Sequence, residues 1–199
     1  MAPRKGWRLP GFGGGVASYD ALLAVFAREG ARDAFEELVR RHHAAIYRLT
    51  VALLRDTAEA EDATQETFLR AYRSLGRYDI GRTFGPWLRG VAVKVCRQRQ
   101  RQLRRREKHI SELAQAYGEA TDGGVPEVSQ AGRAALDGLA RLPDTYRIPL
   151  ALFYVGQASV KEVAQVLGLS LGATRVRLHR GREKLRQMLS TEADGSGDQ

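Results

Sequence analysis

Apolar residues recur at spacings of three, four and seven over most of the chain, which is the period of one face of an α-helix. One such pattern covers residues 35–53, and the next covers residues 60–75 and stops at Gly76. A third begins at residue 87 and leads into the polar run QRQRQLRRR, residues 98–106. No segment alternates apolar and polar residues as a half-buried strand does. The sequence therefore predicts an all-α fold.

Capping signatures predict where several of these helices begin. A short polar side chain followed three residues later by glutamate can satisfy the free amides at a helix start. We also expect Asp144 to cap a helix that runs to residue 155, with only a slight kink at Pro149 because this proline lies just past the first turn. The capping pairs are Asp33 with Glu36, Asp56 with Glu59, and Ser159 with Glu162.

The clearest functional pattern covers residues 159–185, where two predicted helices meet at a tight turn. Gly168 can adopt the left-handed conformation that ends the first helix, and Ser170 can cap the second. An inward stripe on the second helix leaves several basic side chains on its other faces. Such a pair is typical of a helix-turn-helix, whose second helix enters the DNA major groove. The inward stripe is Leu171, Thr174, Leu178 and Leu185.

The charge balance favours a polyanionic partner. The 199 residues include 32 Lys plus Arg against 23 Asp plus Glu, a formal net charge of +9. Basic side chains that neutralise phosphates release counterions, so nucleic acid suits this excess. The single cysteine, Cys96, fits a reducing compartment. No apolar run approaches the roughly 20 residues of a membrane helix, so we expect a cytoplasmic protein without membrane insertion.

The sequence offers little for catalysis. The four histidines form no pair at metal-ligand spacing, and no phosphate-loop lysine follows the glycines of residues 11–15. We therefore expect no metal, no cofactor and no enzymatic activity.

Two neighbouring segments carry opposite charge. Residues 56–66 hold five acidic and no basic side chains, whereas residues 94–108 hold eight basic side chains and one acidic one. The acidic helix would repel DNA and suits a basic protein surface, while the basic run suits a phosphate backbone. The alternative is that both are merely solvated helix faces.

Composition also predicts the domain organisation, because residues 118–130 are rich in Gly, Ser, Thr and Pro and have no helical period. Two small helical domains joined by a flexible linker are expected. The predicted parts are a disordered N-terminal extension (1–18), a first domain (19–108), the linker (109–130), a second domain (131–189) and a disordered tail (190–199).

Taken in order, these motifs resemble the extracytoplasmic-function (ECF) group of the sigma-70 family of bacterial RNA polymerase sigma factors. The resemblance implies that the first domain is region 2, which binds core polymerase and opens DNA at the −10 element. It implies that the second domain is region 4, which recognises the −35 element. The matching segments are EAEDATQETFLRAYRSL, FGPWLRGVAVKV, LPDTYRIPLALFY and VKEVAQVLGLSLGATRVRLHRGREKLRQML, within roughly residues 33–189.

The resemblance also implies partners and site residues. The partners are promoter DNA and core RNA polymerase, through its β′ clamp helices and β flap, and an anti-sigma factor is a further candidate. The implied polymerase-binding residues are Glu61, Asp62, Gln65, Glu66, Phe68 and Leu69. The implied −10 residues are Arg77, Arg82, Thr83, Trp87, Lys94, Arg97 and Gln98. The implied −35 residues on the recognition helix are Arg175, Val176, Arg177, His179 and Arg180.

The chain departs from the family pattern at a few of these positions. Lys94 and Gln98 stand where many members have asparagine and another polar residue, so the −10 preference of those members is not carried over. Thr174 stands where valine is more common, and we expect the packing there to survive at slightly lower stability.

Two other functions compete with this interpretation. A stand-alone helix-turn-helix regulator would bind operator DNA without polymerase, but it would have no use for the acidic helix of residues 56–66. A nucleic-acid enzyme would need the metal or phosphate-binding residues that the sequence does not offer. A basic helix that only packs on its own core is a further alternative for residues 171–185. The sequence favours the sigma factor.

Overall fold

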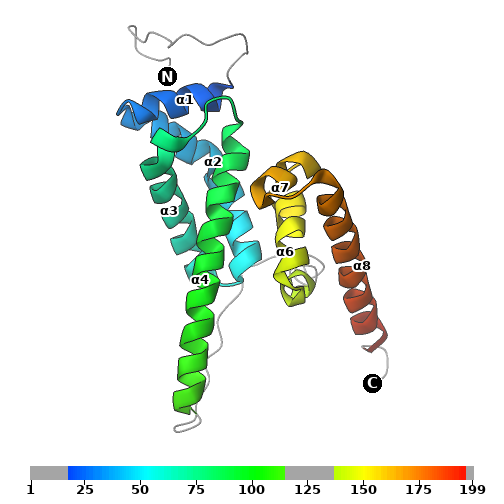
Figure 1. The fold of residues 1–199 in the computed structure, drawn as a ribbon. Coiled ribbons are helices and arrows are strands. Elements are labelled where there is room, and N and C mark those ends of the chain that lie inside the picture. Colours follow the sequence, from blue (N-terminus) through cyan, green and yellow to red (C-terminus); the bar gives the residue numbers. More distant parts are fainter. Residues whose placement is uncertain (1–17, 115–136, 196–199) are drawn as a thin grey trace.

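The structure, a computed structural model, describes residues 18–114 and 137–195, and every regular element within them is a helix. This confirms the predicted all-α class. Residues 1–17, 115–136 and 196–199, which include most of the expected linker and N-terminal extension, lie outside the described residues. The first domain consists of α1 (Tyr19–Arg28), α2 (Arg32–Leu54), α3 (Thr57–Ser74), the 3₁₀ turn η1 (Leu75–Arg77) and α4 (Phe84–Ala114) (Figure 1).

The second domain lies beside α2 and α4 in Figure 1. Residues 137–141 form a helical segment, and α8 runs along the outer side of the domain. The remaining bounds are α6 (Asp144–Leu150), the π-helix η2 (Ala151–Val155), α7 (Val160–Leu167) and α8 (Leu171–Gly195).

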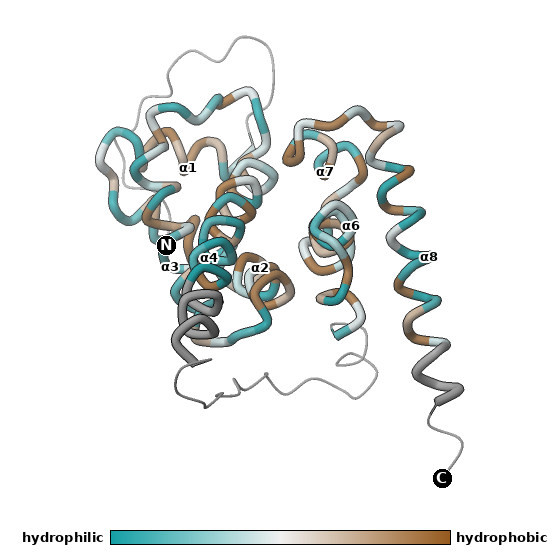
Figure 2. The backbone as a smooth tube through the Cα atoms, turned by 60° about the horizontal axis from the view of Figure 1, so that its bottom comes forward, coloured by the Kyte–Doolittle hydropathy of each residue, from teal (hydrophilic) through white to brown (hydrophobic). Residues whose placement is uncertain are grey.

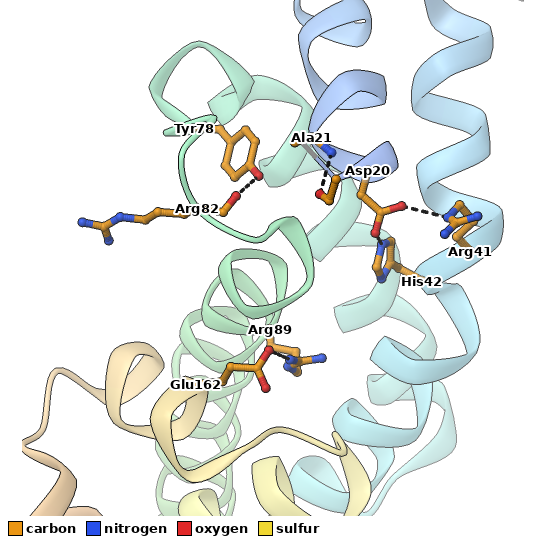
Figure 3. A network of polar contacts seen from close by, with 9 residues as sticks. Asp20, Ala21, Arg41, His42, Tyr78, Arg82, Arg89 and Glu162 are labelled. Atoms are coloured by element: carbon orange, nitrogen blue, oxygen red, sulfur yellow. Dashed lines mark hydrogen bonds and ion pairs between the residues drawn. The ribbon is translucent and has the colours of Figure 1, made fainter. Parts of the chain in front are cut away.

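Helix α2 is central to the first domain because it packs against α1, α3 and α4. Its residues Leu38, Ile46 and Leu49 are fully buried, and Leu88 of α4 joins them in the same core. Figure 2 shows hydrophobic and hydrophilic stretches alternating along the helices, as expected when each helix buries one side. Asp20 ties α1 to α2, since its carboxylate lies 2.9 Å from His42 Nε2 (Figure 3).

A polar contact sits inside this core between α2 and α3. The hydroxyls of Thr50 and Thr64 are buried and lie 2.9 Å apart. Thr64 Oγ1 also donates to the carbonyl of Ala60 at 2.7 Å. Buried hydroxyls that are bonded in this way fix the register of two helices without leaving a polar group unsatisfied.

Three of the predicted helix boundaries are confirmed. The Asp56 carboxylate accepts from the amide of Glu59 at 2.8 Å and so caps α3. Ser159 and Glu162 form the full capping box at the start of α7. Gly168 has φ of 64°, the left-handed conformation expected at the end of that helix.

Two predicted caps are wrong. Ala31 occupies the cap position of α2 without a side-chain bond, and Asp33 lies inside the first turn, where its charge only complements the helix dipole. The backbone carbonyl of Pro143 accepts the first helical bond of α6, from the amide of Arg147 at 2.9 Å. Asp144 is therefore already helical, and its carboxylate pairs with Arg147 instead.

The predicted helix over residues 144–155 differs from the observed one after Pro149. This proline lies inside α6 and has no N–H to donate. The chain then widens into the π-helix η2, where the amide of Gly156 bonds the carbonyl of Ala151 five residues earlier at 2.9 Å. A change of helix type, rather than a slight kink, accommodates the proline.

Three expected boundaries are also shifted. Helix α3 ends at Ser74, and the 3₁₀ turn η1 contains Gly76, the glycine at which the sequence pattern ends. Helix α4 continues to Ala114, so residues 109–114, expected as linker, are helical. Helix α8 continues to Gly195, so much of the tail expected to be disordered is helical as well.

Two glycines of α8 give a matched test of packing in the second domain. A Cβ at Gly181 would lie 2.9 Å from Leu150 Cδ1 and 3.2 Å from Tyr146 Cβ, whereas one at Gly172 would meet only Ser170 Oγ, at 4.0 Å. We expect Gly181→Ala to lower the free energy of unfolding by about 1 kcal/mol, because overpacking outweighs the gain in helix propensity. Gly172→Ala should raise it by about 0.5 kcal/mol. Thermal melts of both variants, followed by circular dichroism, would contradict this packing if Gly181→Ala were also stabilising.

Candidate nucleic-acid and protein interfaces

One exposed face of α3 combines acidic, amide and apolar side chains. Glu61, Gln65 and Leu69 follow one another at four-residue spacing and are all exposed, and Asp62 is exposed beside them. We call these four residues the acidic face. Within the part of the chain that the structure describes, Glu61 makes no ion pair. The face thus offers a free carboxylate next to an exposed leucine.

The neighbouring carboxylates of α3 are already paired inside the domain. Arg99 of α4 donates to Glu59 Oε2 at 2.6 Å and to Asp62 Oδ2 at 3.3 Å. Partial burial opposes the charge of Arg99, but the bonds to these carboxylates prevail and raise its pKa above the usual value. Glu66 pairs with Arg70 along α3 at 2.5 Å. Glu61 is therefore the acidic residue most available to a partner.

Phe68 does not contribute to this surface. From the sequence, either Phe68 or Leu69 could supply the apolar contact to a partner beside the carboxylates. Phe68 is only 6% exposed and its ring stacks on that of His43, with 6.2 Å between the centroids. Leu69, which is 52% exposed, is the residue of the two that a partner can touch. The helical period around Ala71 and Thr67, both buried, already places Phe68 on the inner side.

The loop before α4 rests on an aromatic cluster. The rings of Tyr78, Phe84 and Trp87 contact one another, with centroids 5.0 Å apart for Tyr78 and Trp87 and 5.4 Å apart for Phe84 and Trp87. The Tyr78 hydroxyl donates to the backbone carbonyl of Arg82. Trp87 is half-buried, so it supports the loop more than it projects from it.

The polar side chains of this loop face solvent. Arg77, Arg82 and Thr83 are exposed, and in Figure 3 the Arg82 side chain extends away from the domain. Asp79 Oδ1 accepts from the amide of Gly81 at 3.0 Å, which closes a tight turn. The loop thus presents cationic and hydroxyl groups above a rigid aromatic base.

The basic face of α4 continues from this loop. Lys94 and Arg97 are exposed. Gln98 is half-buried and lines an open cavity of about 370 Å³ between α3 and α4, together with Arg99 and Gln102. Of the four predicted −10 residues on this helix, Lys94 and Arg97 are on the surface, Trp87 is half-buried, and Gln98 is partly turned toward α3.

The recognition helix α8 presents most of its predicted contacts to solvent. Arg175, Val176, His179 and Arg180 are exposed, whereas Arg177 is half-buried. His179 pairs with Glu183 one turn further along the helix, at 3.3 Å. The exposed set combines bidentate donors with an apolar Val176, which is the chemistry that base edges in a major groove require.

The inward stripe of α8 is partly wrong. Leu171 is 46% exposed, whereas Thr174 and Leu178 are buried as expected. Leu171 begins the helix, directly after the Ser170 cap, and lies on the solvent side of a first turn whose other side is buried at Thr174. Thr174 is satisfied by a bond from its hydroxyl to the carbonyl of Ser170 at 2.9 Å, which explains how a polar residue fits the core there.

The described residues contain no group of His, Cys, Asp or Glu side chains that could hold a metal ion. Over the same ranges, no helix has the length and apolar character needed to cross a membrane.

Family models match both domains. The model of Sigma-70 region 2 matches residues 38–106, and that of Sigma-70, region 4 matches residues 133–185. The chain belongs to the ECF group of the sigma-70 family. The first match covers most of α2 and all of α3, and ends within α4, and the second covers α6, α7 and most of α8. The resemblance inferred from the sequence motifs is thereby confirmed.

Individual sigma factors resemble the chain over most of its length. RNA polymerase sigma factor CarQ of Myxococcus xanthus is 38% identical over 81% of this chain and 92% of CarQ. ECF RNA polymerase sigma factor SigW of Bacillus subtilis is 32% identical over the same shares. The structure of CnrH in complex with the cytosolic domain of CnrY superposes with a TM-score of 0.67 and 26% identity, covering 87% of this chain and 99% of CnrH.

The structure adds functional candidates to this ECF sigma factor that the sequence did not suggest. Arg99 joins α4 to α3 through Glu59 and through Asp62 of the acidic face, and Arg89 of α4 joins the first domain to the second. Arg99 lies in the basic run of residues 94–108, where spacing alone cannot tell a buried bridge from a solvated side chain, and Arg89 is an isolated basic residue among apolar ones. Their partners are 40 and 73 residues away, beyond any local signal.

Tyr78 gives a pH-dependent test of the loop. Burial, aided by the charges of Asp20 and Asp79, raises the pKa of Tyr78 from 10.0 to about 12. Between these values the unfolded chain releases the phenol proton and the folded chain keeps it, so this residue makes stability fall as pH rises. In urea unfolding at pH 9 to 12, Tyr78→Phe should lose less stability than the wild type. Parallel curves for the two proteins would mean that the phenol is not held in this environment.

Proposed function

We propose that this sigma factor binds core RNA polymerase and directs it to specific promoters, without catalytic activity of its own. The proposal rests on the combination of three features. The first domain carries the exposed acidic face and a cationic loop that rests on an aromatic cluster, and the second domain carries a helix-turn-helix. A stand-alone regulator has no need of the first two features. As a subunit of polymerase the protein would work in the cytoplasm.

The acidic face is the proposed contact to the β′ clamp helices. Carboxylates such as Glu61 can pair with arginines of a partner helix, and Leu69 supplies an apolar contact in the middle of the same surface. Arg99 keeps Asp62 in place and connects the face to α4. Binding of polymerase to α3 is therefore coupled mechanically to the helix that faces the promoter.

The loop of residues 77–84 is the proposed site of strand capture at the −10 element. A base that leaves the duplex loses a few kcal/mol of stacking, which contacts to the exposed strand must offset. Arg77 and Arg82 can hold the backbone, and Thr83 can bond a base edge. Lys94 and Arg97 extend the cationic track along α4.

Helix α8 is the proposed reader of the −35 element. Arg175 or Arg180 can bond a guanine edge with two hydrogen bonds, and Val176 can touch a thymine methyl group. The β flap of polymerase is the proposed holder of this domain. An anti-sigma factor joins the proposed partners because the related CnrH was solved with the cytosolic domain of CnrY.

The first test is whether the purified chain joins core RNA polymerase and gives it promoter-specific transcription. Glu61→Lys should raise the Kd for core polymerase roughly fivefold or more, since it reverses a charge that has no ion-pair partner among the described residues. Glu29→Lys makes the same charge change at the exposed C-cap residue of α1 and should leave the Kd unchanged. Equal affinity of the Glu61 and Glu29 variants would remove the acidic face from the interface. A chain that binds operator DNA but never core polymerase would be a stand-alone regulator.

The second test separates base contacts from phosphate contacts on α8. Arg175→Ala should weaken binding of the holoenzyme to its promoter by about 1 to 3 kcal/mol, with a smaller effect on unrelated DNA. Arg186→Ala removes the same charge from an exposed position farther along the helix and should affect both DNAs equally. Competition binding with promoter and unrelated duplexes measures this difference. If Arg175→Ala weakens both equally, Arg175 contacts only phosphate.

A further inference from the structure

Asp20 of α1 is held through both of its carboxylate oxygens. Oδ1 accepts from Arg41 Nε at 2.8 Å, and Oδ2 lies 2.9 Å from His42 Nε2 (Figure 3). Because a carboxylate only accepts, His42 Nε2 is the donor of the second bond. The side chain of Arg41 is 45% exposed, whereas that of His42 is only 18% exposed. Arg41 alone would join α1 to α2, so the more buried bond to His42 can serve a second purpose.

The ring of His42 contacts the first turn of α4. Its centroid lies 5.4 Å from that of Phe84, and a Cβ at Gly85 would lie 3.7 Å from His42 Cε1. Phe84 is the first residue of α4 and is 1% exposed. One side chain of α2 thus contacts α1 through a nitrogen atom and the start of α4 through its ring.

Phe84 connects this contact to the loop of residues 77–84. The rings of Phe84 and Tyr78 meet edge to face, with 5.5 Å between their centroids. The Tyr78 hydroxyl donates to the carbonyl of Arg82, so Tyr78 spans the loop from one end to the other. Helix α1 also packs on η1, and the charge of Asp20 is the cause, next after burial, that raises the pKa of Tyr78. Both ends of the loop therefore lie close to Asp20.

We call Asp20, His42 and Phe84 the brace. We infer that the brace holds the loop of residues 77–84 in the shape that captures the exposed strand, so that Asp20 and His42 are positioning residues for promoter opening. This inference rests on the proposed function. Contacts to the strand must offset the loss of base stacking, and a loop that is ordered beforehand loses less conformational entropy when it makes them. A loop without its brace should open fewer promoters.

The competing explanation is that Asp20 only joins α1 to α2. The two explanations differ in what they require of residue 42. A joint between helices needs an N–H donor there, which glutamine also offers, whereas the brace needs the ring that touches Phe84. They differ as well for Arg41, which holds the same carboxylate but makes its other ring contact with Tyr19, at 5.1 Å.

The experiment compares Asp20→Ala and His42→Gln with the matched control Arg41→Gln in the full-length protein. Each holoenzyme is tested on a promoter duplex that the wild-type holoenzyme has selected from genomic fragments. The brace variants should lower the permanganate reactivity of thymines near the start site about fivefold or more. Their Kd for core polymerase, and for the promoter in the cold where the duplex stays closed, should remain within about twofold of the wild type. Arg41→Gln should open the promoter as the wild type does.

Trp87 reports on the loop without polymerase. It contacts both Tyr78 and Phe84, and Trp7→Phe leaves it as the one tryptophan of the chain. In that background, acrylamide should quench Trp87 more strongly in the two brace variants than in the parent. The Arg41→Gln control should be quenched like the parent.

The variant that combines Asp20→Ala with His42→Gln decides whether the two residues act through each other. If they do, it opens promoters no worse than the more defective single variant. The inference is overturned if His42→Gln opens promoters normally, or if Arg41→Gln is as defective as Asp20→Ala. It is also overturned if affinity for core polymerase falls in step with opening, or if both brace variants lose helical circular dichroism. Wild-type protein that fails to bind core polymerase would instead refute the proposed function, and the quenching of Trp87 would still show whether the brace orders the loop.

Discussion

Helix α4 packs against α2, α3 and α7 at once. The positions of the candidate interfaces depend on that packing. The helix contacts α3 through Arg99, α2 through apolar residues such as Leu88, and α7 through Arg89. The side left over carries Lys94 and Arg97 toward solvent. A rotation of α4 by a fraction of a turn would break the Arg99 bridge and move the basic face away from the loop of residues 77–84.

The opposite charges of α3 and α4 therefore serve two purposes. Some of them cancel inside the domain, where Arg99 joins Glu59 and Asp62. Others are exposed, with Glu61 on the acidic face of α3 and Lys94 on α4. A single small domain can in this way bind a basic protein surface and a polyanion without either partner competing for the other's site.

Local signals in the sequence predicted the parts of the fold that depend on neighbours in sequence. Asp56, Ser159 and Gly168 act within one helical turn, and all three boundaries are where the pattern placed them. The predictions fail where packing between helices decides which side chain is exposed, or where a neighbouring residue takes the cap position. Pro143 and not Asp144 occupies the cap position of α6, and Leu171 lies on the solvent side of the first turn of α8, whereas Thr174 in the same turn is buried.

The same distinction applies to the candidate interfaces. The acidic run predicted the interface on α3, and the tryptophan-led basic helix predicted the one at α4 and the loop before it. The glycine turn predicted the interface on α8. Which residues face outward did not always follow, since Gln98 needed the packing of α4 against α3 to be placed. The contact between domains had no local signal at all, because Arg89 and Glu162 are each ordinary residues of a helix pattern.

The central claim is that this chain gives core polymerase both promoter choice and strand opening. Permanganate footprinting, on a promoter selected by the holoenzyme from genomic fragments, tests this claim directly. We predict unpaired thymines near the start site only when chain and core polymerase are both present, and fewer of them when residues 79–83 are replaced by glycine while promoter binding persists. Thymines that stay protected with the wild-type holoenzyme bound, or normal reactivity with the glycine loop, would contradict the account.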